Sequence, residues 1–218
     1  MKCMNFQALA AVAVALFAFT QASAQNSLVD PSFEGTLTFD GAPFVGSWEG
    51  FSAGGSSTSE FSTEMPRTGA QSLEVNIGPD ANLFAGAFQD VLAAAGSDVT
   101  FSVWHKDLSG SNGQGIEMRL EFRNSISDTE ISRTPNAIPV TLGAEYELFS
   151  LSGEVPVGAD LIRAVYAIQS FGGTLNQQIF VDDASLTGVV PEPASLLLFG
   201  LTAIGGAVVL RGQRRSNS

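Results

Sequence analysis

Carboxylate and guanidinium side chains alternate along one short stretch of this chain and form its clearest group of chemically active residues. Glu117, Arg119 and Glu121 alternate with apolar residues between positions 115 and 123. In a β-strand such residues share one face, where they could form hydrogen bonds with the hydroxyl groups of a ligand. The alternative, which the charge pattern favours, is a solvent face whose opposite charges compensate one another.

The types and spacing of these residues do not favour catalysis. A glycosidase or lyase needs two carboxyl groups about 5–9.5 Å apart, whereas Glu117 and Glu121 would lie ~13 Å apart along one strand. The chain has one histidine, His105, and one cysteine, Cys3, so most pairings of a nucleophile with a base lack a member. It has no nucleophile elbow, zinc-protease motif or phosphate loop. We therefore predict that the protein is not an enzyme.

Two tryptophans are candidate platforms for stacking on a sugar ring. Residues 99–106 alternate in polarity and place Trp104 among polar neighbours, while His105 falls on the apolar side. The face of an indole ring attracts the C–H groups of a sugar. The alternative is a loop that covers Trp104, because tryptophan is highly buried on average. The candidate carbohydrate-binding residues are Trp48, Trp104, Glu117, Arg119 and Glu121.

The elements that must position these residues are β-strands throughout the middle of the chain. Short alternating runs are separated by Gly, Asn, Asp, Ser and Pro, and no long helix is expected between the two termini. Strands are predicted at 36–40, 58–62, 72–77, 83–89, 99–106, 115–123, 146–153, 161–170 and 178–187. Such short strands without a cysteine framework favour an all-β fold, a two-sheet antiparallel jelly-roll sandwich.

The predicted folded domain, residues 25–189, is strongly acidic. It contains six Lys and Arg residues against 21 Asp and Glu residues, and its length suits a single domain. An acidic surface repels nucleic acid and anionic lipid. We therefore expect no nucleic-acid partner.

Residues 1–24 have the composition of a secretory signal peptide. Lys2 supplies the positive charge, residues 8–19 form an apolar stretch too short to span a bilayer, and residues 22–24 are the small cleavage-site residues. We expect signal peptidase to cleave after Ala24. Because Cys3 leaves with this peptide, the mature chain has no cysteine for a disulfide or a metal site.

Residues 190–218 combine three features in a fixed order. Pro191, Glu192 and Pro193 keep the backbone extended. Residues 194–210 form an uncharged apolar run of 17 residues, about 26 Å long as a transmembrane helix, and the basic end 211–215 follows. The arginines should stay in the cytoplasm, which places the middle of the chain across the membrane. On the residues alone, a plain C-terminal anchor explains this tail equally well.

The order and position of these parts resemble the PEP-CTERM sorting signal of exported bacterial proteins. The resemblance covers residues 190–218 alone. It implies an exosortase, a membrane-embedded cysteine protease or transpeptidase, that acts near Pro191, Glu192 and Pro193. The C-terminal helix would then hold the chain in the membrane until processing, after which the protein would stay at the cell surface or leave it.

Three motifs in the middle resemble the galactose-binding-like jelly rolls that include carbohydrate-binding modules of the family 4/9 type. They are LVDPSFEG at 28–35, VTFSVWHK at 99–106 and IFVDDASL at 179–186, in the family's order. The chain departs from the family at Asp30-Pro31, where Asn-Gly is common. The resemblance implies carbohydrate binding and often a structural calcium ion where the first and last strands meet. Carried over by position, the calcium ligands would be Glu34 and Asp183.

These features together predict an exported cell-surface or extracellular-matrix protein that binds a polysaccharide, such as an exopolysaccharide, without catalysis. One alternative is a structural protein of a surface or biofilm with no discrete ligand. A polysaccharide hydrolase or lyase is less favoured. The positions of Trp48 and Trp104 distinguish these hypotheses, because exposed tryptophans favour binding and buried ones favour a structural role.

Overall fold

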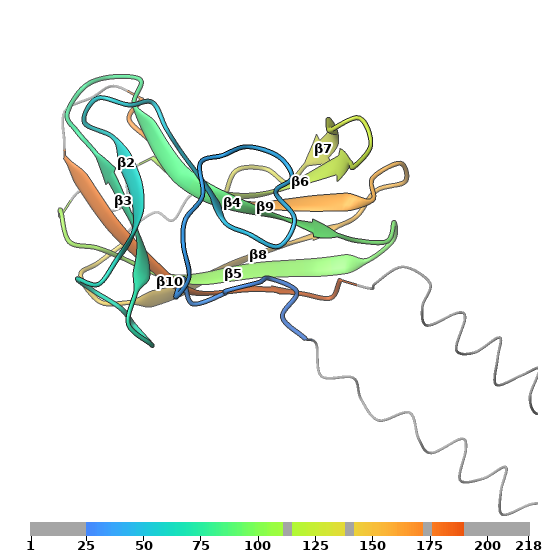
Figure 1. The fold of residues 1–218 in the computed structure, drawn as a ribbon, viewed down its shortest axis with the longest axis horizontal. Helices are drawn as coiled ribbons and strands as arrows, with labels where there is room; N and C mark the ends of the chain where they lie inside the picture. The colour runs from blue at the N-terminus through green and yellow to red at the C-terminus, as the bar shows by residue number, and fades with distance from the viewer. Residues whose placement is uncertain (1–24, 111–114, 138–141, 172–175, 190–218) are drawn as a thin grey trace, which may run out of the picture.

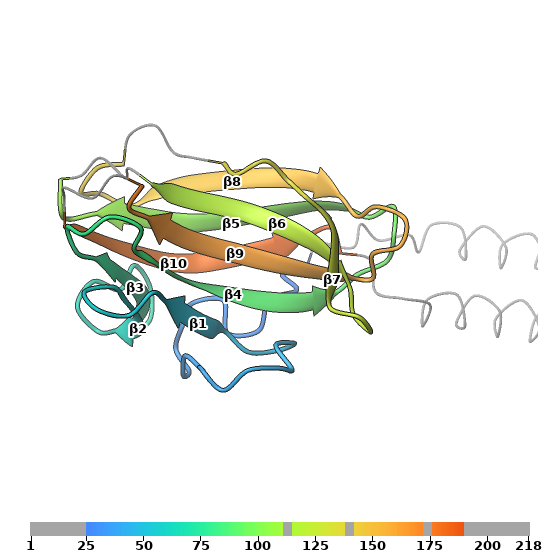
Figure 2. The same ribbon diagram turned by 90° about the horizontal axis from the view of Figure 1, so that it is seen from above.

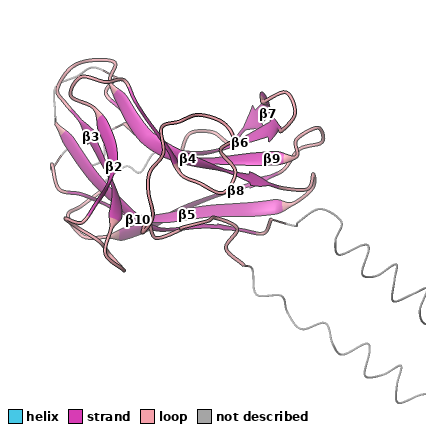
Figure 3. Ribbon diagram, viewed as in Figure 1, coloured by secondary structure: helices cyan, strands magenta, loops and turns pink. Residues whose placement is uncertain are grey.

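Two antiparallel sheets of five strands pack face to face in the computed structural model, which describes residues 25–110, 115–137, 142–171 and 176–189 (Figures 1 and 3). This architecture confirms the predicted all-β jelly-roll sandwich. In these described ranges no helix is long and apolar enough to cross a membrane. The predicted signal peptide, the apolar run 194–210 and the basic end lie outside them.

The strand order follows the crossed connections of a jelly roll. One sheet has the order β1-β4-β9-β6-β7 and the other β2-β3-β10-β5-β8. The strands are β1 (Glu49–Ser52), β2 (Thr58–Ser62), β3 (Ser72–Ile77), β4 (Phe84–Leu92), β5 (Asp98–Asp107), β6 (Ile116–Asn124), β7 (Thr129–Arg133), β8 (Glu147–Glu154), β9 (Leu161–Gln169) and β10 (Gln177–Thr187).

Eight of the nine predicted strands correspond to strands of the structure, and three elements differ. The predicted strand at 36–40 is wrong, because Thr38 forms only an isolated bridge with Glu49. Strand β1 was missed because it is four residues long and contains Gly50. Strand β7 was missed because it is an exposed edge strand with charged residues and no buried position.

The alternation of β6 sets the core on one side of its sheet. Its apolar residues are at most 4% exposed and point between the sheets. They are Ile116, Met118, Leu120 and Phe122. Strand β4 turns Ala85 and Ala87 inward, and both are fully buried opposite β9. These small side chains leave room for the fully buried Tyr166.

Both ends of the described domain leave the sandwich at the same end (Figures 1 and 2). The N-terminal segment runs beside the last strand, where the Ser27 N–H donates to the Leu186 carbonyl. The Asn26 amide donates to the Ala184 carbonyl and accepts from the Leu186 N–H. The start of the predicted mature chain is therefore held against β10.

Candidate functional site

The outer face of the β1-β4-β9-β6-β7 sheet brings together three of the predicted binding residues. The alternation of β6 turns Glu117, Arg119 and Glu121 away from the core. Their pairing partners on the adjacent strand β9 are Ala167, Val165 and Arg163, respectively. This outer face is called the binding face below, after the predicted binding residues that it carries.

Arg119 joins the two carboxylates of the binding face. Its Nε donates to Glu121 Oε1 at 2.8 Å, and its Nη1 donates to Glu117 Oε2 at 3.3 Å. Arg123 Nη1 donates to the second oxygen of Glu121 at 2.9 Å. The alternating charges thus compensate one another, as the favoured interpretation held. The predicted solvent exposure of this face is wrong, however, because the Glu117 and Glu121 side chains are only 6% and 7% exposed.

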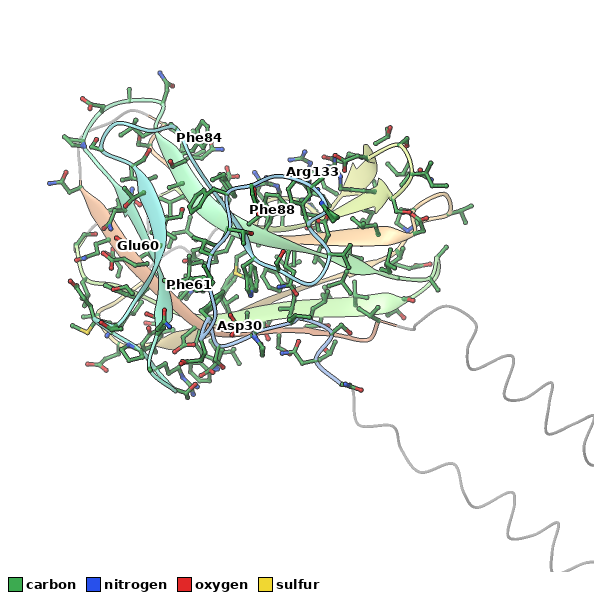
Figure 4. The ribbon with its side chains drawn as sticks, viewed as in Figure 1. Asp30, Glu60, Phe61, Phe84, Phe88 and Arg133 are labelled. Carbon is green, nitrogen blue, oxygen red and sulfur yellow. The ribbon has the colours of Figure 1, made fainter. Side chains whose placement is uncertain are left out.

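Four phenylalanines missed by the sequence analysis lie beside this ion-pair network. Phe84 is 41% exposed, and the others are half-buried. Ring centroids are 4.9 Å apart for Phe44 and Phe88, 6.2 Å for Phe51 and Phe88, and 6.3 Å for Phe51 and Phe84. In Figure 4, Phe84, Phe88 and Arg133 follow one another along the upper side of the sandwich. The binding face therefore pairs an aromatic surface with a row of charges.

Arg163 contacts both the aromatic rings and the charged side chains of the binding face. Its guanidinium lies 4.3 Å from the Phe88 ring centroid and 4.9 Å from that of Phe44. The same group makes two hydrogen bonds, of 2.7 and 2.9 Å, to the carboxylate of Asp90. A bidentate pair of this kind holds both side chains in a defined geometry.

The two predicted tryptophan platforms lie elsewhere. Trp48 is 2% exposed, packs 5.0 Å from the Phe33 ring centroid and donates its Nε1–H to the Asp30 carbonyl at 3.0 Å. It is therefore a core residue rather than the platform that the sequence suggested. Trp104 is half-buried on the outer face of the other sheet, where the guanidinium of Arg67 lies 3.8 Å from its ring centroid. Trp104 and Glu117 thus belong to opposite faces and do not form one site.

The predicted calcium ligands lie on either side of one loop, residues 67–71. Glu34 Oε1 accepts hydrogen bonds from the N–H groups of Ala70 and Gln71. Asp183 accepts from the hydroxyls of Ser32 and Thr68 and forms an ion pair with Arg67.

The positive charge next to Asp183 comes from the chain itself, from the guanidinium of Arg67. Burial works to raise the pKa of Asp183, but hydrogen bonds from Thr68, Ser32 and Arg67 outweigh it, and the pKa lies below its usual value. Burial raises the pKa of the neighbouring Asp182. No group of three or more metal-ligating side chains occurs in the described part of the chain. Arg67 supplies a positive charge beside Asp183, and the chelator experiment below tests whether a calcium ion binds there as well.

We expect excess EGTA to leave the melting temperature of the protein unchanged. A calcium ion that binds the folded state alone would stabilise it, so its removal would lower the melting temperature. Replacing Arg67 with glutamine should lower the melting temperature in both conditions, because the Asp183 carboxylate then lacks its ion-pair partner. Thermal unfolding with and without chelator measures both effects, and a fall on adding EGTA to the unmodified protein would restore the calcium hypothesis.

A hollow of about 510 Å³ lies at the end of the sandwich away from the two termini. Among its lining residues are Asn76, Gln177 and Gln178. The amides of Asn76 and Gln178 both donate to Glu74 Oε1, at 2.8 and 3.0 Å. Gln177 Oε1 is buried without a hydrogen-bond partner among the described residues. This amide-lined hollow is a further polar surface among the described residues that could meet hydroxyl groups.

The chain has a match among protein-family models at its C-terminal end. Residues 189–215 match the PEP-CTERM protein-sorting motif, which confirms the resemblance seen in the tail. The motif indicates an exported protein that is sorted to the cell surface. No curated protein matches the sequence.

Solved structures with the same fold include a carbohydrate-binding module and part of a phage enzyme. The CBM22-1 xylan-binding domain from Paenibacillus barcinonensis Xyn10C is 16% identical, with a TM-score of 0.52 over 78% of this chain and 97% of that one. The enzymatically active domain of Bacteriophage CBA120 tailspike protein 4 is also 16% identical, with a TM-score of 0.53 over 76% of this chain. The match spans only 21% of the tailspike chain.

A third structure, TmCBM61 in complex with β-1,4-galactotriose, is 15% identical, with a TM-score of 0.49 over 76% of this chain and 99% of that one. Identities this low concern the fold alone. The molecule is therefore a jelly-roll sandwich, of the fold found in carbohydrate-binding modules, that carries a PEP-CTERM sorting motif at its C-terminal end.

Proposed function

We propose that this chain is an exported surface protein that binds a polysaccharide through the binding face and does not transform it. Phe84 supports this most directly, because a large aromatic side chain remains 41% exposed beside three further rings and a row of charged groups. Sugars offer apolar C–H faces to aromatic rings and hydroxyls to charged side chains. A neutral glycan such as the cell's own exopolysaccharide fits best, since the arginines here are already paired with carboxylates.

The proposal includes that the protein does not catalyse a reaction on the polysaccharide. Glu117 and Glu121 both accept hydrogen bonds from Arg119, and Glu121 also accepts one from Arg123. A glycosidase needs two carboxyl groups placed on either side of the scissile bond. These two carboxylates lie on one strand and are instead held by arginines of the protein.

The two ends of the chain suggest how the protein is exported and processed. Signal peptidase would cleave after Ala24, and the apolar run 194–210 would hold the exported chain in the membrane. An exosortase would then process it near Pro191, Glu192 and Pro193. The protein would finish at the cell surface or in the extracellular matrix.

Affinity gel electrophoresis against a panel of neutral polysaccharides tests the binding proposal. We expect retardation in at least one gel and about tenfold weaker binding for Phe84→Ala, which corresponds to ~1.4 kcal/mol of lost stacking. Leu148→Ala is the matched control, because Leu148 is 54% exposed on the other sheet. Thermal unfolding should show that Phe84→Ala is folded.

The variants also separate the alternative locations. Retardation lost in Trp104→Ala but kept in Phe84→Ala would place the ligand on the β2-β3-β10-β5-β8 sheet. Binding that survives both changes and is lost in Gln178→Ala would place it at the amide-lined hollow. No retardation by any polysaccharide would favour a structural surface protein, a role with which the self-compensated charges of β6 are also consistent.

A further inference from the structure

The last strand of the sandwich leads directly into the sorting motif. Strand β10 ends at Thr187, and the motif begins at residue 189. Gly188 adopts a positive φ of 84°, and a Cβ atom there would lie 2.0 Å from the Asp98 carbonyl oxygen. Val189 still packs against the core. No free linker therefore separates the sandwich from the tail.

This short connection limits how far the domain can stand from a bilayer. Only the six residues 188–193 lie between β10 and the apolar run. At ~3.3–3.6 Å per residue they reach about 20 Å when fully extended. If residues 194–210 span the membrane, as the proposed function holds, the end of the sandwich next to Val189 is held close to the headgroups.

Three loops make up this end of the sandwich. They connect β4 to β5, β6 to β7, and β8 to β9, and Figure 2 shows them where the termini leave. The Gly96 N–H donates to the Val155 carbonyl at 2.7 Å, and the Asp160 N–H donates to the Arg123 carbonyl at 3.0 Å. The Ser125 N–H and hydroxyl donate to the two carboxylate oxygens of Asp160. The three loops are thus joined into one surface, called the loop end below.

The loop end carries the most exposed large apolar side chains of the described residues. Ile126 is 93% exposed and Val157 is 91% exposed, while Leu92, at the end of β4, is 56% exposed. Single exposed apolar residues are common on protein surfaces. Here the two extreme cases occupy neighbouring loops at the one end that the tail brings to the membrane.

The charges of the loop end limit the kind of lipid that it can meet. Asp98 and Glu154 are both exposed and lie directly opposite each other on β5 and β8. The two arginines that contact Asp128 in the β6–β7 loop, Arg123 and Arg163, are also paired with Glu121 and Asp90 respectively. Such a surface is repelled by anionic headgroups and not by zwitterionic ones.

We propose that the loop end is a membrane-docking surface, in which Ile126 and Val157 enter the headgroup region of a zwitterionic bilayer while the tail spans it. This inference rests on the membrane span of the proposed function. Burying two aliphatic side chains is too weak to hold a free domain on a membrane, but the tail keeps them at high local concentration. Docking would present residues 190–193 at a fixed height above the bilayer.

Site-specific probes test the proposal. The only cysteine of the chain is Cys3, which signal cleavage removes, so a single introduced cysteine can carry an NBD fluorophore. The exported chain with its tail intact, made in a host without an exosortase, is reconstituted in phosphatidylcholine nanodiscs as I126C, V157C or F171C. Phe171 is 65% exposed at the opposite end of the sandwich and is the control position.

We expect blue-shifted NBD emission that is quenched by doxyl lipids at positions 126 and 157. At position 171 we expect aqueous emission that is quenched by iodide. Adding phosphatidylglycerol should reduce the shift at 126 and 157, because the loop end is acidic. Replacing Ile126 with aspartate should abolish the shift at position 157 without releasing the protein from the nanodisc.

Three outcomes would overturn the proposal, and they are distinguishable. Aqueous emission at 126 and 157 from a protein that stays in the nanodisc would refute docking while leaving the membrane span intact. Protein that does not remain with the lipid would refute the span and docking together. A shift that is absent from these nanodiscs and appears only when an exosortase is reconstituted with the protein would assign the loop end to that enzyme instead.

Discussion

Replacing Glu121 with alanine is expected to lower the free energy of unfolding by about 3 kcal/mol, the lower end of the range for breaking a buried ion pair. The Glu121 side chain is 7% exposed and bonds Arg119 at 2.8 Å and Arg123 at 2.9 Å. Its loss leaves both guanidinium groups partly buried with one fewer anion. The expected loss lies at the low end because each arginine keeps another carboxylate, Glu117 for Arg119 and Asp128 for Arg123.

Asp128→Ala is the matched control for this change. Asp128 bonds the same Arg123, at 2.8 Å, but its side chain is 64% exposed. Exposed ion pairs contribute at most about 1 kcal/mol. Denaturant unfolding of the two variants should therefore give clearly different midpoints with similar slopes. Equal and small losses would mean that the network is solvated and that burial of Glu121 adds nothing to the stability.

The alternation of β6 shows how much the sequence could predict. Apolar residues at every second position specified one core face, and the residues between them specified a self-compensating row of charges; the structure confirms both. The same pattern could not give the burial of Glu117 and Glu121. That burial depends on the two neighbouring strands: β7, which the sequence analysis missed, and β9, which comes from a distant part of the chain.

The aromatic surface of the binding face was missed for a related reason. The predicted strand at 83–89 offers two registers, one with Phe84 and Phe88 and the other with Ala85 and Ala87. Hydrophobicity alone favours turning the phenylalanines inward. The structure turns the alanines inward because Tyr166 on the adjacent β9 fills the space between the sheets. A residue some 80 positions away thus decides which face of the strand meets solvent.

The tryptophans illustrate the limit of single-residue reasoning. Polar neighbours placed Trp104 on an outer face, which is correct, but its cover comes from Arg67 in a loop that the pattern of β5 cannot reveal. Trp48 precedes β1, a strand too short to be seen as an alternating run. Its position under Phe33 depends on the turn at Asp30, whose carbonyl accepts the indole N–H.

Between pH 6.5 and pH 4 the protein should lose about 3 kcal/mol of stability through His105 alone. His105 lies between the sheets, 1% exposed, with Nδ1 2.9 Å from the hydroxyl of Tyr166. Burial lowers the pKa of this imidazole from 6.5 to about 4. Below pH 6.5 the unfolded chain binds a proton that the folded chain does not, so the unfolded state gains stability as the pH falls. Well above pH 6.5 both states are neutral, and the contribution of His105 is constant.

The variant His105→Gln separates this effect from the titration of the carboxylates. Glutamine can still bond the Tyr166 hydroxyl but carries no proton that titrates in this range. The groups near His105, which include Tyr166, Asp107 and the exposed Glu147 opposite it on β8, are present in both proteins. Denaturant unfolding at a series of pH values should therefore give a slope about one proton shallower for the variant between pH 6 and pH 4.5. Parallel curves for the two proteins would show that His105 takes up its proton in the folded state, which would require water or an alternative partner to reach the interior between β5 and β9.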